Sequence, residues 1–144
     1  MSTGSVDDAH SRPEGVGDEL VAATGKLAEA LTAVERARGA LYDVHRLIGD
    51  ADEMLDDVVA GMRRSGRDDL ADRVRDELIG RNVLDGRWTF QIVEEFDDGY
   101  YTAFRELEKA VRDELLHGRR HVFEAEMKER RRTKGQPGHE PTPD

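Results

Sequence analysis

Cysteine is absent from this chain of 144 residues, and its four prolines are confined to the two ends. Without thiols the chain cannot form disulfide bonds, thiolate metal sites or iron–sulfur clusters, and it has no cysteine nucleophile. No proline occurs between Glu14 and Gln136. Because proline disrupts a helix interior more than any other residue, this long stretch can form extended helices.

Long apolar runs are also missing. No stretch approaches the roughly 18 apolar residues of a membrane span, and residues 1–17 lack the hydrophobic block of a signal peptide. Arginine outnumbers lysine by 18 to 4, which favours a genome rich in G and C. We therefore expect a bacterial cytoplasmic protein that does not associate with membranes.

The alternation of apolar and polar residues that is typical of strands is scarce. The sequence therefore predicts an all-α fold, namely an elongated antiparallel helical bundle or coiled-coil-like hairpin with one long spine helix. Residues 18–132 are expected to form this helical domain. Residues 1–17 and 133–144 are polar, contain the prolines and have little to bury, so we expect both segments to be disordered.

A heptad repeat runs through the first half of the domain. Apolar residues recur every seven positions from Leu20 to Met62, and a second apolar series lies three residues after the first, from Ala23 to Val58. All 13 of these positions are apolar over 43 residues. This pattern predicts one helix over about residues 18–64, on the order of 70 Å long.

The width of this apolar seam changes along the spine. It is narrow up to residue 38 and wider from residue 40, where Leu47, Met54 and Val59 flank it. A narrow seam suits one partner helix and a wide seam suits a bundle, so we expect the second half to lie in a local bundle. The first half is expected to contact one other helix. We expect that helix to come from a second subunit, forming a homodimer through Leu20, Leu27, Leu31 and Val34.

Three shorter helices are expected over about residues 67–80, 88–117 and 119–132, with the path of residues 80–87 left open. The third has an apolar seam through Val93, Phe96, Tyr100, Ala103, Leu107 and Ala110, widened by Ile92, Phe104 and Val111. Six of the eight aromatic residues lie within residues 88–104, which favours a core anchor, with a docking patch for a protein partner as the alternative. Phe90 and Tyr101 fit the seam least well and are the candidates for exposed interaction residues.

Acidic residues outnumber basic ones by 32 to 22, which gives a formal net charge of −10. This charge repels nucleic acid and anionic lipid, so neither is the expected partner of the whole chain. Residues 117–136 differ, with seven basic and three acidic residues. A solvated helix end explains this segment most simply. Contact with phosphate or with another subunit is the alternative, through the run Arg130, Arg131 and Arg132.

One carboxylate–imidazole pattern is present. Glu114, His117 and His121 would share a face if they lay on one helix. Ferritin-like di-iron bundles use two such Glu-x-x-His motifs with further glutamates, whereas this chain has one motif, which Gly118 interrupts. His45 is a further candidate ligand. We expect no metal or cofactor, and a small ferritin-like metal-binding bundle is the alternative function.

Sequence motifs of enzymes are missing. The chain contains no phosphate-binding loop, nucleophile elbow or His-Glu-x-x-His motif. The heptad seam is the strongest signal that the sequence carries. We therefore expect a helical interaction or assembly protein without enzymatic activity, which self-associates through the Leu/Ala heptad seam.

Overall fold

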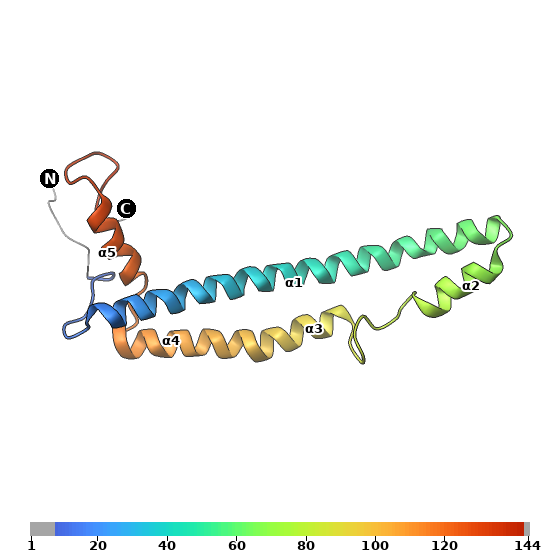
Figure 1. Ribbon diagram of the computed structural model, residues 1–144, viewed down its shortest axis with the longest axis horizontal. Helices are drawn as coiled ribbons and strands as arrows, with labels where there is room; N and C mark the ends of the chain where they lie inside the picture. The colour runs from blue at the N-terminus through green and yellow to red at the C-terminus, as the bar shows by residue number, and fades with distance from the viewer. Residues whose placement is uncertain (1–7, 143–144) are drawn as a thin grey trace. The chain divides into compact units, whose positions relative to one another are not determined.

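The computed structural model describes residues 8–142, and this part of the chain is helical, without a β-strand (Figure 1). The predicted all-α fold is confirmed. Residues 1–7 and 143–144, at the ends of the two segments predicted to be disordered, lie outside the described residues. The elements in chain order are α1 (Asp18–Arg64), α2 (Asp68–Glu77), α3 (Thr89–Phe96), the π-helical segment η1 (Asp97–Tyr101), α4 (Thr102–Leu116) and α5 (Val122–Arg131).

The spine helix α1 is continuous over 47 residues, with the bounds that the heptad repeat predicts. It ends where Gly66 adopts a left-handed conformation with φ of 75°. The Gly66 N–H donates to the carbonyl of Arg63 at 3.0 Å, and the Arg67 N–H donates to that of Met62 at 2.8 Å. This pair of bonds satisfies two of the carbonyls that a helix end leaves without partners, and glycine is the residue that permits it.

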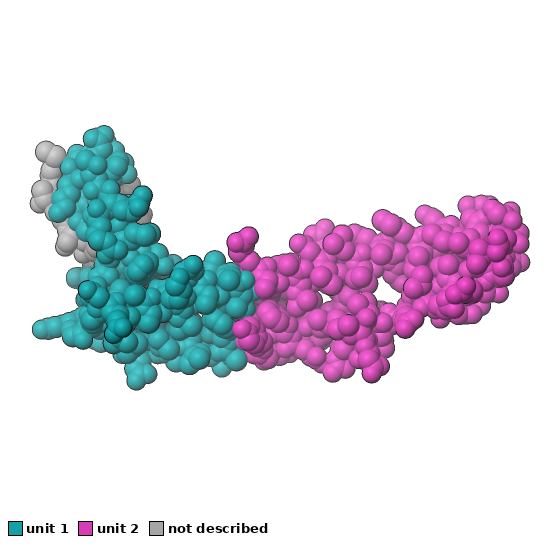
Figure 2. Space-filling model, viewed as in Figure 1, with its two compact units in different colours: residues 1–34, 103–144 teal, residues 35–102 magenta. Residues whose placement is uncertain are grey.

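The chain divides into two compact units, each of which contains part of α1 (Figure 2). Unit 1 comprises residues 1–34 and 103–144, and unit 2 comprises residues 35–102. Unit 1 therefore holds the first third of α1 together with nearly all of α4 and with α5. Unit 2 holds the rest of α1 with α2, α3 and η1.

Unit 1 has a small, tightly closed core. Val21 of α1, Leu116 of α4 and Val122 of α5 are each less than 5% exposed and contact one another. The start of α1 thus lies beside the end of α4, as an antiparallel arrangement requires. At Gly25 the backbone of α1 approaches Phe123 so closely that a Cβ atom there would lie 2.7 Å from the Phe123 Cβ. Glycine is needed at this position because it leaves room for α5.

Residues 8–17 contact α5 and the loop before it, although the sequence predicts disorder for residues 1–17. Arg12 forms an ion pair with Glu126, with 2.8 Å between Nε and Oε1, and a second pair with Asp18 at 2.7 Å. Pro13 is buried. The Arg119 guanidinium donates to the carbonyl of Ser11 at 2.9 Å. These contacts connect the segment before α1 to the core of unit 1.

Unit 2 is also antiparallel but has little core. Successive residues of α1 contact progressively earlier residues of the chain that returns beside it. In order along α1, these contacts are Arg38 with Asp97, His45 with Thr89, Asp52 with Gly80 and Arg63 with Asp72. Among the described apolar side chains of this unit, Ala71 and Val93 are the buried ones. Residues 80–87, whose path the sequence left open, include a tight turn with a bridge between Leu84 and Arg87.

The expectation that the second half of α1 lies in a local bundle is wrong. Leu47 is 65% exposed and Met54 is 66% exposed. The width of an apolar stripe shows how much surface could be buried, but burial requires helices that can cover it. In unit 2 the returning chain supplies the ten-residue α2, an irregular segment and the eight-residue α3, and these leave one face of α1 open.

The π-helical segment shifts the buried face of the helix that follows it. A π-helix bonds each N–H to the carbonyl five residues earlier, and the Thr102 N–H bonds in this way to the carbonyl of Asp97. The seam positions predicted after this insertion are exposed: Tyr100, Ala103, Leu107 and Ala110. The residue after each of them is partly buried: Tyr101, Phe104, Glu108 and Val111. The predicted seam is therefore correct at Val93, which is buried. Beyond η1 its central positions are exposed, whereas Phe104 and Val111, which were predicted to widen it, are partly buried.

Candidate functional site

Two contacts fix which face of α1 is covered in unit 2. His45 Nδ1 lies 2.7 Å from the Thr89 hydroxyl, and the Asp52 carboxylate accepts the Gly80 N–H at 3.0 Å. His45 and Asp52 are seven residues apart and so lie on the same side of the helix. The opposite side of this part of α1 is not covered by these two contacts.

An apolar stripe lies on a different face of the same stretch. Its five residues follow one another at spacings of three and four, which puts them on one side of a helix. None of them is buried, and Leu47 and Met54 are about two-thirds exposed. We define the apolar stripe as Val44, Leu47, Ala51, Met54 and Val58.

A row of carboxylates borders the apolar stripe on one side. Asp43, Asp50 and Asp57 are spaced by seven residues, and all three are exposed. In a coiled coil, residues that flank the apolar seam in this way lie beside the partner helix. We call these three residues the aspartate row. The seven-residue spacing of these aspartates is visible in the sequence, but a heptad count restricted to apolar residues does not include it.

A cluster around Asp97 attaches η1 to α1 within unit 2. Both carboxylate oxygens of Asp97 accept bonds from Arg38, at 2.7 and 3.0 Å, and one also accepts the Tyr42 hydroxyl at 2.9 Å. The Arg38 hydrogen bonds, supported by the Tyr42 hydroxyl, lower the pKa of Asp97 below its ordinary value, although partial burial opposes the shift. The cluster is a structural anchor for the π-helical turn.

Of the two aromatic rings predicted to be exposed, one is exposed in the structure. Phe90 is 45% exposed. Tyr101 is partly buried, because its ring stacks on Phe96 with 6.2 Å between centroids and the Arg38 guanidinium lies 5.0 Å from its centroid. The more exposed ring is its neighbour Tyr100, at 60%. Exposure of Tyr101 was therefore the wrong expectation, and the shift at η1 is the reason.

The predicted dimer seam, Leu20, Leu27, Leu31 and Val34, lies in unit 1. Leu20 is 43% exposed, whereas the other three side chains are partly buried within a single chain. Figure 1 shows α4 running beside this part of α1. Most of the seam is thus already covered inside unit 1, and dimer formation through it stays a prediction.

The basic segment contains one arginine with a different role from its neighbours. Arg130 and Arg131 are exposed, but the Arg132 side chain is only 2% exposed. It forms two bonds to the Glu129 carboxylate, at 2.7 and 3.0 Å, and donates to the carbonyl of His139 at 3.3 Å. These bonds also hold the pKa of Glu129 below its ordinary value. Arg132 fastens the end of α5 to the following loop, so its expected role in an exposed interaction surface is wrong.

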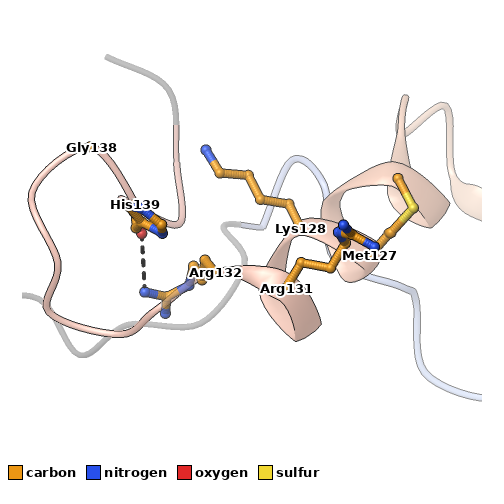
Figure 3. A pocket seen from close by; sticks show the side chains of 6 residues that line it. All are labelled: Met127, Lys128, Arg131, Arg132, Gly138 and His139. Carbon is orange, nitrogen blue, oxygen red and sulfur yellow. Dashed lines mark hydrogen bonds between the residues drawn. The ribbon is translucent and has the colours of Figure 1, made fainter.

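A hollow of about 360 Å³ lies beside this arginine (Figure 3). It is lined by Met127, Lys128, Arg131, Arg132, Gly138 and His139. In Figure 3 the ammonium of Lys128 and the guanidinium of Arg131 point in different directions, and Arg132 is turned toward the His139 carbonyl. Because the cations do not converge, the hollow is not built around an anion.

The candidate metal ligands are not brought together. α4 ends at Leu116, so His117 and His121 lie in the connection to α5 rather than on one helix with Glu114. Both histidines have left-handed backbones, with φ of 52° and 56°. His45 lies in unit 2 and contacts Thr89. Within residues 8–142, no group of three or more side chains is placed to hold a metal ion.

Among the described helices, none is both long enough and apolar enough to cross a membrane. No family model, curated protein or solved structure matches this chain.

Proposed function

We propose that this chain is a non-enzymatic assembly protein that self-associates through the apolar stripe of α1. The stripe carries the proposal because it combines heptad spacing with exposure of its largest side chains. Contiguous exposed apolar surface of this kind marks interaction sites in soluble proteins. The proposal keeps self-association through the apolar edge of the spine but assigns it to the second half, where the described part of the chain leaves the stripe exposed.

The energetics favour association. Complete burial of a leucine or methionine side chain contributes about 1.5–3 kcal/mol, so Leu47 and Met54 can contribute substantially when a partner covers them. Composition favours a bacterial cytoplasmic setting for this role.

Light scattering after size exclusion tests the proposal with the full-length chain. We expect a mass above the monomer value of 16.2 kDa that rises with protein concentration. The double variant Leu47→Ser with Met54→Ser should shift the mass toward the monomer. Leu107→Ser is the matched control, because Leu107 is 62% exposed on α4, outside the stripe, and should leave association unchanged.

Two outcomes would contradict the proposal. A wild-type chain that has the monomer mass at all concentrations up to hundreds of micromolar does not assemble. Equal loss of association in the stripe variant and in Leu107→Ser would show that association does not depend on the stripe.

A further inference from the structure

The region around the apolar stripe is strongly acidic. Residues 43–57 contain six acidic residues and one arginine, for a formal charge of −5 with histidine neutral. The aspartate row lies directly beside the stripe, and its three carboxylates form no ion pair within residues 8–142. A partner that covers the stripe must therefore approach a line of uncompensated negative charge.

This charge disfavours pairing of the stripe with itself. If two copies of α1 met antiparallel along the stripe, the aspartate row of one copy would lie against that of the other. Like charges facing one another across an interface oppose association. In a parallel pair the aspartates would face the opposite flank of the stripe, which carries Ile48 and Leu55. Neither arrangement pairs the carboxylates with cations.

Unit 1 presents a surface of complementary character on α5. Residues 119–134 contain seven basic and three acidic residues, a formal charge of +4. On one side of α5, Phe123 is 37% exposed and Met127 is 41% exposed. The side chains of Lys128, Arg130 and Arg131 are exposed around them. We define the basic patch as Phe123, Met127, Lys128, Arg130 and Arg131.

We propose that the basic patch of one copy docks on the apolar stripe and aspartate row of a second copy. This inference rests on the proposed function and specifies its interface. Phe123 and Met127 would contact Leu47 and Met54, while the arginines and lysine neutralise the aspartate row. The two surfaces differ, so each copy offers one of each and the contact is head-to-tail. Such contacts close into rings or continue into open chains.

The size of the proposed interface determines how strong the association is expected to be. α5 has ten residues and is about 15 Å long, so the contact falls among interfaces smaller than about 1,200 Å², which are typical of transient complexes. Charge contributes much of the attraction across such a contact and is screened by salt. Association should therefore be concentration-dependent and should weaken as ionic strength rises.

Charge reversal tests the pairing directly. The first variant combines Asp43→Lys, Asp50→Lys and Asp57→Lys, and the second combines Lys128→Glu, Arg130→Glu and Arg131→Glu. Each variant alone carries two surfaces of the same sign, so we expect its association constant to fall about tenfold or more. An equimolar mixture restores one native and one reversed contact, so it should assemble again in sedimentation velocity at low salt.

A matched control separates this pairing from a general effect of net charge. Asp85→Lys, Glu106→Lys and Glu114→Lys change the charge as much as the first variant, at exposed positions outside the stripe. We expect this control to associate like the wild type. Circular dichroism checks that every variant is helical. If a triple variant does not fold, the milder changes Asp50→Asn and Arg131→Gln replace it, and each should weaken association.

The outcomes that overturn this inference differ from those that overturn the proposed function. If the wild type assembles and each reversed variant assembles equally well alone, the copies associate without the charged pairing, and the assembly role stands. A wild type that remains monomeric at low salt removes both. A monomeric wild type that binds a DNA duplex, with binding lost in the second variant, would assign the basic patch to nucleic acid instead.

Discussion

Units 1 and 2 share the same helix and the same heptad repeat, yet they bury very different amounts of apolar surface. In unit 1, Val21, Leu116 and Val122 come from three helices and are each less than 5% exposed. In unit 2, Leu47 and Met54 lie on the same spine and are about two-thirds exposed. A heptad repeat therefore specifies a helix with an apolar edge, whereas the rest of the chain decides whether that edge is covered.

The difference arises from the helices that lie beside α1 in each unit. Unit 1 has the 15-residue α4 beside the spine, and Gly25 allows α5 to approach closely. In unit 2, α2 and α3 are short, and polar contacts such as that of Arg38 with Asp97 hold much of the hairpin together. Unit 1 has a closed core, whereas unit 2 leaves an apolar face of α1 exposed.

The largest expected effect comes from opening the core of unit 1. Leu116→Ala should lower the free energy of unfolding by about 2–5 kcal/mol, because it removes a buried side chain and leaves a cavity. Leu47→Ala, at an exposed position of unit 2, should change it by no more than about 0.5 kcal/mol in the monomer. Urea unfolding at low protein concentration measures both. Equal destabilisation by the two variants would contradict the contrast between the units.

An intermediate effect is expected from adding a methyl group at the helix contact of unit 1. Gly25→Ala should destabilise by about 1–3 kcal/mol, since the new Cβ would overlap Phe123. Gly39→Ala is the control in unit 2, where a Cβ meets nothing within 4 Å. It should stabilise by about 0.5–1 kcal/mol, because alanine favours helix interiors over glycine. Thermal unfolding distinguishes the two, and a stabilising Gly25→Ala would contradict the close contact.

The smallest expected effect is on the stability of the fold at low pH. Because Arg38 lowers the pKa of Asp97, the folded state favours the carboxylate. This contribution to stability is fully present above the ordinary pKa of 3.8 and is lost as the pH falls through the lowered value. Asp97→Asn should therefore be less stable than the wild type at neutral pH and equally stable in strong acid. Urea unfolding followed by the fluorescence of Trp88, in unit 2, measures this, and a difference that persists in strong acid would refute it.

Much of the helical layout could be predicted from local patterns. The bounds of α1 follow from periodicity over many turns, so the predicted and observed bounds agree. The exposed face of α4 did not follow, because η1 inserts one residue and moves Tyr101 inward and Tyr100 outward. Nothing in a heptad count detects such an insertion.

The candidate site was predictable in kind but only partly in position. A basic α5 was expected, and Arg130 and Arg131 are exposed. The exposed apolar stripe lies in the second half of the spine, which was expected to be covered, whereas the seam expected to face a partner lies in the first half. Arg132 could not be distinguished from them by sequence, since all three are arginines in one run. The Glu129 carboxylate and the His139 carbonyl draw its side chain inward, and that depends on how the loop folds back on α5.

Amino-acid order alone determined that this chain is helical, that its spine extends from Asp18 to Arg64 and that one edge of that helix is apolar. These properties depend on neighbours within a few turns, which a linear pattern records. Tertiary structure decided that Leu116 is buried and Leu47 exposed. It also decided that α1 needs a glycine at residue 25, because the backbone there lies against Phe123. Burial is a property of two surfaces, and the second surface is supplied by segments far away in the sequence.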